Sequence, residues 1–220
     1  KKSKKLKFNK FIKLKNVSFK YSERDNYILK NISITLKKNS IIGIIGKSGQ
    51  GKSTLVDLIT GLIKPTHGDI KVDNKKINKK NELSWQKNIA YVPQKVHVID
   101  TSISQNIAFG INKEKVDFNL VEKCSNVAEL TKFINSKKDK FETQIGERGT
   151  RLSGGQIQRI GIARALYYDA NILIFDESTN SIDEETEKRI YDNLKKLNKK
   201  YTVLVITHRK SLIKFFDSTY

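Results

Sequence analysis

The sequence predicts an α/β protein with a parallel sheet, a strand-rich first third and a helical segment in the middle. Three observations carry this prediction. Strand patterns fill the first third of the chain, a helical period takes over between about 102 and 166, and two short apolar strands then flank a charged helix. Strands that alternate with helices usually pair in parallel, so the last part should belong to a parallel sheet.

The first third contains strands on either side of a glycine-rich break. Apolar patterns predict strands over 11–19, 28–36 and 41–45, and residues 46–52 interrupt them. From Ser53 to Leu62 the apolar residues recur at helical spacing, and Pro65 with Gly68 ends that segment before a further strand over 69–72. The order is therefore strand, glycine loop, helix, strand.

The later elements follow from the change of period. Five apolar residues of the helical segment are expected to face inward: Val116, Leu120, Val121, Val127 and Leu130. Strands are predicted over 172–175 and 202–206, with an amphipathic helix over 184–199 between them.

Composition limits the function classes. The chain has 220 residues, 37% of them hydrophobic, and no apolar run approaches the ~18 to 20 residues that cross a bilayer. The single cysteine, Cys124, excludes an internal disulfide framework and is expected to be a packing thiol. The net charge of +20 suits a nucleic-acid or anionic-membrane partner, but lysines are spread along the whole chain and only seven of the 43 basic residues are Arg. A solvated basic surface is the preferred explanation.

Residues 46–53, Gly-Lys-Ser-Gly-Gln-Gly-Lys-Ser, fit the phosphate-loop pattern, and they follow a predicted strand and open a predicted helix. Glycines let backbone N–H groups converge on phosphates, and the helix N-terminus favours negative charge. Lys52 would neutralise phosphate oxygens and the Ser53 hydroxyl would bind Mg²⁺. A glycine-rich turn without a ligand is the alternative, which the flanking elements disfavour.

Asp176 and Glu177 follow a buried strand at its C-terminal end, where open α/β sheets bind ligands. In a phosphate-binding protein, Asp176 would hold Mg²⁺ and Glu177 would orient or deprotonate the attacking water. A solvated acidic pair is the alternative for this motif taken alone.

Leu152-Ser153-Gly154-Gly155-Gln156 resembles the signature motif of the ATP-binding cassette family. Other family motifs occur in the expected order: an aromatic Tyr21, Gln94 in Tyr-Val-Pro-Gln, a D-loop over 178–183, and His208 after the last strand. The resemblance spans nearly the whole chain. It implies a RecA-like P-loop core with a mainly parallel sheet, an N-terminal antiparallel β subdomain and an inserted helical subdomain. The core would comprise about 8–95 and 165–220, and the helical subdomain about 96–164.

The resemblance also implies roles for residues. Tyr21 would stack on adenine, although packing is its alternative role. Gln94 would sense Mg²⁺ or water, and His208 would contact the γ-phosphate; a loop cap and a core histidine are the respective alternatives. A head-to-tail dimer would bring the signature of one copy to the ATP of the other. The implied ATP contacts are Tyr21, Gly46, Lys47, Ser48, Gly49, Gln50, Gly51, Lys52, Ser53, Thr54, Ser153, Gly154, Gly155 and Gln156; the implied metal contacts are Ser53, Gln94 and Asp176; and the implied catalytic residues are Glu177, His208 and Gln94.

Two further segments resemble exporter cassettes, namely 143–149, Thr-Gln-Ile-Gly-Glu-Arg-Gly, and 101–110. They imply a partner with transmembrane domains, a place at the cytoplasmic face of the inner membrane, and a chain excised from a longer membrane protein. The exporter cassettes that they resemble include those that move lipids, lipid-linked oligosaccharides or peptides, but no residue of the cassette itself indicates the cargo. Gln50 and the D-loop residues Asn180 to Asp183 depart from the usual pattern without removing a charged catalytic group. The alternative function is a soluble cassette ATPase that acts on nucleic acid or ribosomes. A regulator that binds ATP without hydrolysing it is disfavoured, because the chain has all of Lys52, Asp176, Glu177 and His208.

Overall fold

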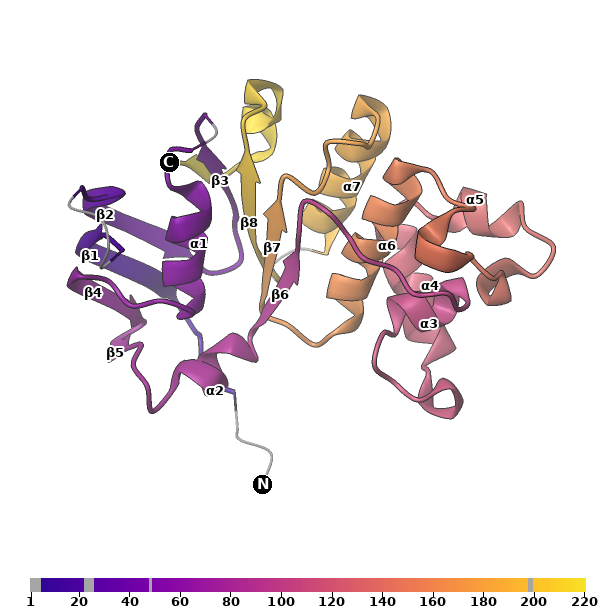
Figure 1. Cartoon of the computed structure of the whole chain (residues 1–220), viewed down its shortest axis with the longest axis horizontal. Helices are drawn as coiled ribbons and strands as arrows, with labels where there is room; N and C mark the ends of the chain where they lie inside the picture. Colours follow the sequence, from indigo (N-terminus) through magenta and orange to yellow (C-terminus); the bar gives the residue numbers. More distant parts are fainter. Residues whose placement is uncertain (1–4, 22–25, 48, 198–199) are drawn as a thin grey trace. The chain divides into compact units, whose positions relative to one another are not determined.

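The computed structural model describes residues 5–21, 26–47, 49–197 and 200–220. The chain folds into two compact units: Lys1–Ile89 with Ala170–Ile174 and Lys199–Tyr220, and Ala90–Asp169 with Phe175–Asn198. Figure 1 follows the chain from indigo to yellow through the elements of both units.

The first unit begins with an antiparallel sheet of order β2-β1-β4-β5. Its strands are β1 (Phe11–Phe19), β2 (Leu29–Lys37), β4 (His67–Val72) and β5 (Lys75–Lys76). Strand β1 pairs with both β2 and β4, and these three strands lie side by side in Figure 1. The antiparallel β region expected from the sequence is confirmed.

The side-chain alternation in β1 differs from the expected one. The sequence pattern puts every second residue from Phe11 to Phe19 on one face, but the buried residues are Ile12, Leu14, Val17 and Phe19. The register shifts between Leu14 and Val17, where Asn16 has a φ of +50°. Such an irregularity adds a residue and changes which side chains face the core.

A second sheet has the order β6-β7-β8-β3-β9, and β8 and β9 run parallel to β3. Its strands are β3 (Ile41–Ile45), β6 (Ile89–Val92), β7 (Ile172–Asp176), β8 (Thr202–Thr207) and β9 (Ser218–Thr219). Strands β3, β7 and β8 have almost the predicted bounds and are buried along nearly their whole length. This burial explains their continuous apolar sequences, because parallel strands are covered on both faces.

The helices of the first unit are α1 (Lys52–Thr60), α2 (Glu82–Gln86) and the 3₁₀ segment η4 (Lys210–Phe215). Helix α1 ends at Thr60, two residues before the expected end at Leu62, and Gly61 with a φ of +73° is its C-cap. Leu62, expected on the inner face of the helix, is 66% exposed. Trp85 is fully buried and its Nε1–H donates to the Ile59 carbonyl at 2.8 Å.

The second unit is mainly helical, and it includes the segment from about 102 to 166 for which the sequence predicted helices. It contains α3 (Ile103–Ile107), α4 (Phe118–Val127), α5 (Thr131–Asn135), α6 (Gly154–Tyr167) and α7 (Glu184–Lys196), with short 3₁₀ segments η1 (Lys113–Lys115), η2 (Lys140–Glu142) and η3 (Glu147–Gly149). Helix α6 packs against α3 and α4, and α4 also contacts α7. Of the residues expected to face inward, Val121 and Leu130 are fully buried, whereas Val116, Leu120 and Val127 are half-buried. Cys124 is buried, as expected.

Helix α7 begins at a well-formed cap. The Asp183 carboxylate accepts a hydrogen bond from Thr186 N at 2.8 Å, and this backbone donor is the main reason why the pKa of Asp183 lies below its ordinary value. Three glutamates occupy the first turn and two lysines the last turn. This charge order opposes the helix dipole and so favours the helix.

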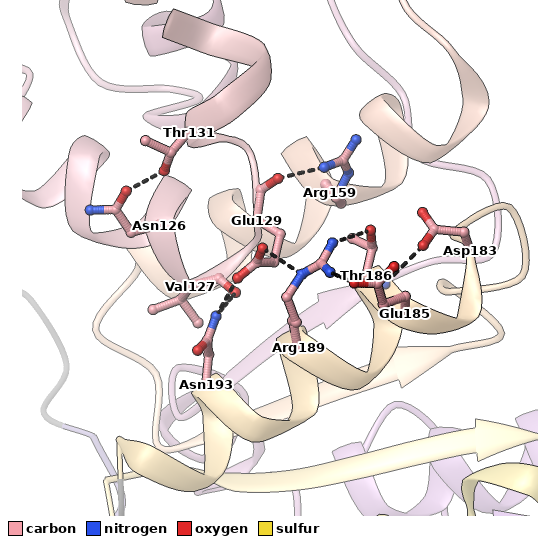
Figure 2. Close-up of polar contacts among 10 residues, drawn as sticks. All are labelled: Asn126, Val127, Glu129, Thr131, Arg159, Asp183, Glu185, Thr186, Arg189 and Asn193. Carbon is pink, nitrogen blue, oxygen red and sulfur yellow. Dashed lines mark hydrogen bonds and ion pairs between the residues drawn. The ribbon is translucent and has the colours of Figure 1, made fainter.

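The corner between α4 and α5 is hydrogen-bonded to two other helices of the second unit, α6 and α7 (Figure 2). Glu129 lies there with a φ of +58°, and its carbonyl accepts a hydrogen bond from Arg159 of α6. Its carboxylate accepts from Arg189 Nε at 3.0 Å and from Asn193 Nδ2 at 2.8 Å, both on α7. Burial lowers the pKa of the Arg159 guanidinium below its ordinary value. Helices α6 and α7 are therefore linked through one residue.

Candidate functional site

The glycine-rich loop of the first unit joins β3 to α1. Gly49 and Gly51 have φ of +81° and +85°, which L-residues with a side chain rarely adopt. A Cβ on Gly51 would also lie 2.9 Å from Ile28 Cγ2. Gly51 is the N-cap of α1, so the loop leads directly to a helix N-terminus, where N–H groups and the helix dipole favour an anion.

Two side chains brace this loop. Lys52 Nζ donates to the carbonyls of Gly46 and Lys47, each at 2.8 Å, so its ammonium lies over the loop. Gln50 Oε1 accepts from Lys47 N at 2.6 Å. The unusual Gln50 therefore adds a contact that closes the loop upon itself. Ser48, predicted as an ATP contact, lies outside the described residues.

The next two residues of the loop motif begin α1 and differ in exposure. Ser53 is exposed, which suits a hydroxyl that binds a ligand, and Thr54 is 8% exposed.

Tyr21 and His208 lie in the first unit as well. The Tyr21 ring is 42% exposed and packs edge-on against Phe19, with ring centroids 4.9 Å apart. An exposed aromatic ring of this kind is suited to stacking on a flat base. His208 directly follows β8 and is exposed. Their roles toward ATP stay predictions.

The second unit holds the carboxylate pair at the end of β7. Asp176 is the last residue of that strand, and Glu177 has a φ of +47°, an uncommon conformation for a residue with a side chain. Such backbone conformations cluster at functional sites. Gln94 Nε2 donates to Glu177 Oε2 at 3.2 Å. The predicted Gln94, Asp176 and Glu177 are thus brought together.

Two residues without a predicted role also contact this pair. Tyr91 Oη donates to Asp176 Oδ2 at 2.6 Å, and Asn180 Nδ2 donates to Glu177 Oε2 at 3.3 Å. Sequence reasoning noted Tyr91 only as part of the motif around Gln94. The outward position of Tyr91 could be read from its buried neighbours Ala90 and Val92, but the pairing of β6 with β7 could not.

The signature segment forms the start of α6. Ser153 is the N-cap: its Oγ accepts from Gln156 N at 3.2 Å, while Ser153 N donates to Gln156 Oε1 at 2.9 Å. This capping box fixes the start of a 14-residue helix. Gly154 and Gly155 form its first turn, and a helix N-terminus of this kind suits a phosphate.

The D-loop residue Ser181 packs against this helix start. Ser181 N donates to Gln158 Oε1 at 2.9 Å, and a Cβ on Gly155 would lie 2.7 Å from the Ser181 carbonyl oxygen. A hollow of about 560 Å³ lies beside them, lined by 94–98, Gly154, Ile157, Gln158 and Ser181. The signature, the segment after Gln94 and the D-loop therefore share one surface of the second unit.

Two kinds of feature are absent from the described residues. No group of three or more His, Cys, Asp or Glu side chains there is placed to hold a metal ion. No helix among those residues is both long enough and apolar enough to cross a membrane.

A phosphate loop between a parallel strand and a helix, together with a carboxylate pair at the end of another strand, defines a P-loop nucleotide-binding protein. The ABC transporter family matches residues 29–180, which is more than half of the chain. The chain belongs to this family and is its ATP-binding ATPase domain.

Known relatives agree with this assignment. The ATP-dependent lipid A-core flippase of Aliivibrio fischeri is 42% identical over 206 residues, which make up 94% of this chain and 35% of that protein. The flippase of the same name from Pasteurella multocida is 39% identical over 207 residues, with the same coverage. The chain thus spans about a third of the length of the curated relatives that it matches.

A solved structure, described as a bacterial Atm1-family ABC exporter with ATP bound, has a TM-score of 0.88 and 32% identity. It covers 99% of this chain, which in turn covers 38% of that protein. The predicted fold class, an α/β P-loop core with an antiparallel sheet and a helical part, is confirmed.

Proposed function

We propose that this chain hydrolyses ATP to power an exporter, and that it works as a head-to-tail dimer with two ATP molecules at the interface. One observation carries the proposal. Two separate elements suited to phosphate occur in the chain, each at the start of a helix: the loop before α1 and the signature before α6. In a head-to-tail dimer, the signature of one copy closes on the ATP that is bound by the loop of the other.

The binding roles follow the chemistry of each group. Tyr21 stacks on adenine, and the residues from Gly46 to Thr54 surround the phosphates with backbone N–H groups. On binding ATP, the Lys52 ammonium exchanges its two carbonyl partners for phosphate oxygens. Ser153 to Gln156 contribute the second phosphate surface, and His208 contacts the γ-phosphate.

The donors in the chain fit a Mg²⁺ ion that is held mainly by the nucleotide. Mg²⁺ at such sites keeps several waters and takes only one or two protein carboxylates besides phosphate oxygens. The described residues offer no three-ligand cluster but do offer the exposed Ser53 hydroxyl and the half-buried Asp176 carboxylate. Ser53, Asp176 and Gln94 would hold the ion, which when bound neutralises charge on the phosphates.

Glu177 is the proton acceptor in this proposal. The Gln94 and Asn180 amides both donate to its Oε2, and these contacts hold the carboxylate that would accept the proton of the attacking water. The left-handed backbone conformation of Glu177 sets the direction in which its side chain leaves the backbone. A positioned general base is typically worth ~10² to 10⁴ in rate.

The cargo and the partners are inferred from the relatives. The flippases and the ABC exporter described above support an export function. The lipid A-core flippases alone support a lipid-like cargo. The partners in this proposal are a second copy of the chain and membrane-spanning domains, with the ATPase at the cytoplasmic face of the inner membrane. The segment 143–149, with Gly146 and Gly149 at φ of +76° and +72°, would contact those domains. The core would comprise about 8–95 and 165–220, and the helical subdomain about 96–164.

A Glu177→Gln variant tests the proposal. The amide keeps the size of the side chain but cannot accept the proton, so ATP binding should survive while turnover falls by ~10² or more. With ATP and Mg²⁺, size-exclusion chromatography should show a shift from the 25.2 kDa mass of one copy to twice that mass. Near-native turnover in this variant would move the base role to another residue, with His208 as the first candidate.

Two further variants separate the surfaces. Lys52→Ala should abolish both ATP binding and the dimer, because it removes the cation over the loop. Ser153→Arg, added to Glu177→Gln, should keep ATP binding by calorimetry but block the dimer. Equal loss of ATP binding in both would exclude a contact of Ser153 with the other copy.

The dependence of activity on concentration is the last test. Each complete site needs residues from two copies, so the specific activity of the unmodified chain should rise with protein concentration. A specific activity that is constant over a wide range of concentration would argue against the dimer.

A further inference from the structure

Tyr91 is placed to hold one of the two carboxylates of the site. It lies in β6, where its neighbours Ala90 and Val92 are 9% and 1% exposed and Tyr91 is 47% exposed. The strand thus turns Tyr91 away from the core, as alternation along a strand requires. Its Oη donates to Asp176 Oδ2 at 2.6 Å. This length lies within the ordinary range for a hydrogen bond between a hydroxyl donor and an oxygen acceptor.

The two carboxylates have different donors. Glu177 receives the amides of Gln94 and Asn180 on Oε2, whereas the Asp176 contact is a phenol from the neighbouring strand. A tyrosine ring on a strand has few accessible rotamers, so it fixes the direction of its hydroxyl better than a long flexible side chain would. Asp176 ends β7, and its carboxylate is held from the side of β6.

We propose that Tyr91 is a positioning residue for the divalent cation that binds with ATP. The phenol occupies one lone-pair direction of Oδ2 and so restricts the rotation of the carboxylate, which would hold the metal or its bound water through the remaining lone pairs. Hydrogen-bonded partners of this kind orient metal-binding carboxylates, and their loss typically costs about 10- to 100-fold in metal affinity or activity. The inference rests on the proposed role of Asp176 in metal binding.

The test compares ATP binding with and without metal. Calorimetry on the 220-residue chain gives the ATP dissociation constant in EDTA and in Mg²⁺. Both are measured with Glu177→Gln and Ser153→Arg present, so that ATP is not consumed and the dimer does not form. The ratio of the two constants is the gain in affinity that the metal supplies. Tyr91→Phe should leave the dissociation constant in EDTA unchanged within about twofold. It should reduce the ratio about 10-fold or more; if the ratio in the chain that keeps Tyr91 is below about ten, Tyr91→Phe should reduce it to one.

A matched control and a double-mutant cycle define the mechanism. Tyr167→Phe also removes a phenol of the second unit that takes part in a hydrogen bond, here with Asp117 N at 3.1 Å, and it should change neither constant. If Tyr91 acts through Asp176, Tyr91→Phe should have no further effect on the ratio once Asp176→Asn is present.

Each other result has a distinct meaning. Absence of ATP binding both in EDTA and in Mg²⁺, in the chain that keeps Tyr91, would overturn the proposed function. An unchanged ratio in Tyr91→Phe, with intact binding in EDTA, would overturn the role of Tyr91 alone. A larger ratio would mean that the phenol competes with the metal for the carboxylate, the opposite of the proposal. A ratio of one in the chain that keeps Tyr91 would remove Asp176 from metal binding, and the inference with it.

Discussion

Because the D-loop packs on the start of α6, alanine should affect the stability of the protein differently at two adjacent glycines. Gly154 and Gly155 both lie in the first turn of α6, and neither has a positive φ, so alanine fits the backbone at each position. A Cβ on Gly154 would meet Ser181 Cβ and Oγ at 3.5 Å, an ordinary contact. A Cβ on Gly155 would lie 2.7 Å from the Ser181 carbonyl oxygen, closer than real Cβ atoms come to a backbone atom.

The magnitude follows from these distances. For Gly155→Ala the two backbone segments must separate by several tenths of an ångström, and overpacking of this kind costs about 1–3 kcal/mol. Each substitution also restricts the unfolded chain and favours the helix, by up to about 1 kcal/mol. Both variants share this stabilisation, so the difference in their free energies of unfolding reports the cost of the close contact at position 155. Gly155→Ala should be less stable than Gly154→Ala by about 1–3 kcal/mol.

Thermal unfolding followed by circular dichroism measures this difference. For a chain of this size 1 kcal/mol shifts Tm by about 2–4 °C, so Gly155→Ala should unfold roughly 2–12 °C below Gly154→Ala. Gly154→Ala should unfold at or slightly above the temperature of the unmodified chain. Equal unfolding temperatures, or a higher one for Gly155→Ala, would refute the close packing of Ser181 on α6 and the shared surface derived from it.

Two further predictions concern a donor at the carboxylate pair and the pH dependence of stability. Asn180→Ala removes one of the amides on Glu177 and should lower kcat about three- to tenfold, worth about 1 kcal/mol, with ATP affinity unchanged; loss of affinity at constant kcat would contradict a role through Glu177. Asp73 has its pKa lowered because three backbone N–H donors outweigh the opposing effect of burial; the donors are Asn9, Lys10 and Phe11. A folded-state pKa below the unfolded one stabilises the protein above the unfolded value of about 3.9, and the effect is lost as pH falls through the folded value. In urea unfolding, the stability gap between the unmodified chain and Asp73→Asn should be constant above about pH 5 and shrink below about pH 4. A gap that does not change down to about pH 2 would show that Asp73 is not the group responsible.

The sequence by itself determined the order of elements and the family. Strands over 41–45, 172–175 and 202–206 were predictable because strands buried on both faces are apolar throughout, and the structure has them at nearly those bounds. The loop glycines were predictable because phosphate binding needs backbone conformations that glycine supplies, as Gly49 and Gly51 confirm. Motifs of this kind are local in sequence, so no knowledge of pairing is needed to find them.

Only the tertiary structure decided how residues far apart in the chain meet. Tyr91 and Asp176 are 85 residues apart, and their hydrogen bond depends on the pairing of β6 with β7. Glu129 links α6 and α7 through its backbone carbonyl and its carboxylate. The sequence around Glu129 does not predict either contact. The register shift in β1 likewise depends on pairing with β2. Sequence periodicity reports which face of an element is buried, but it does not report the neighbour against which that face lies.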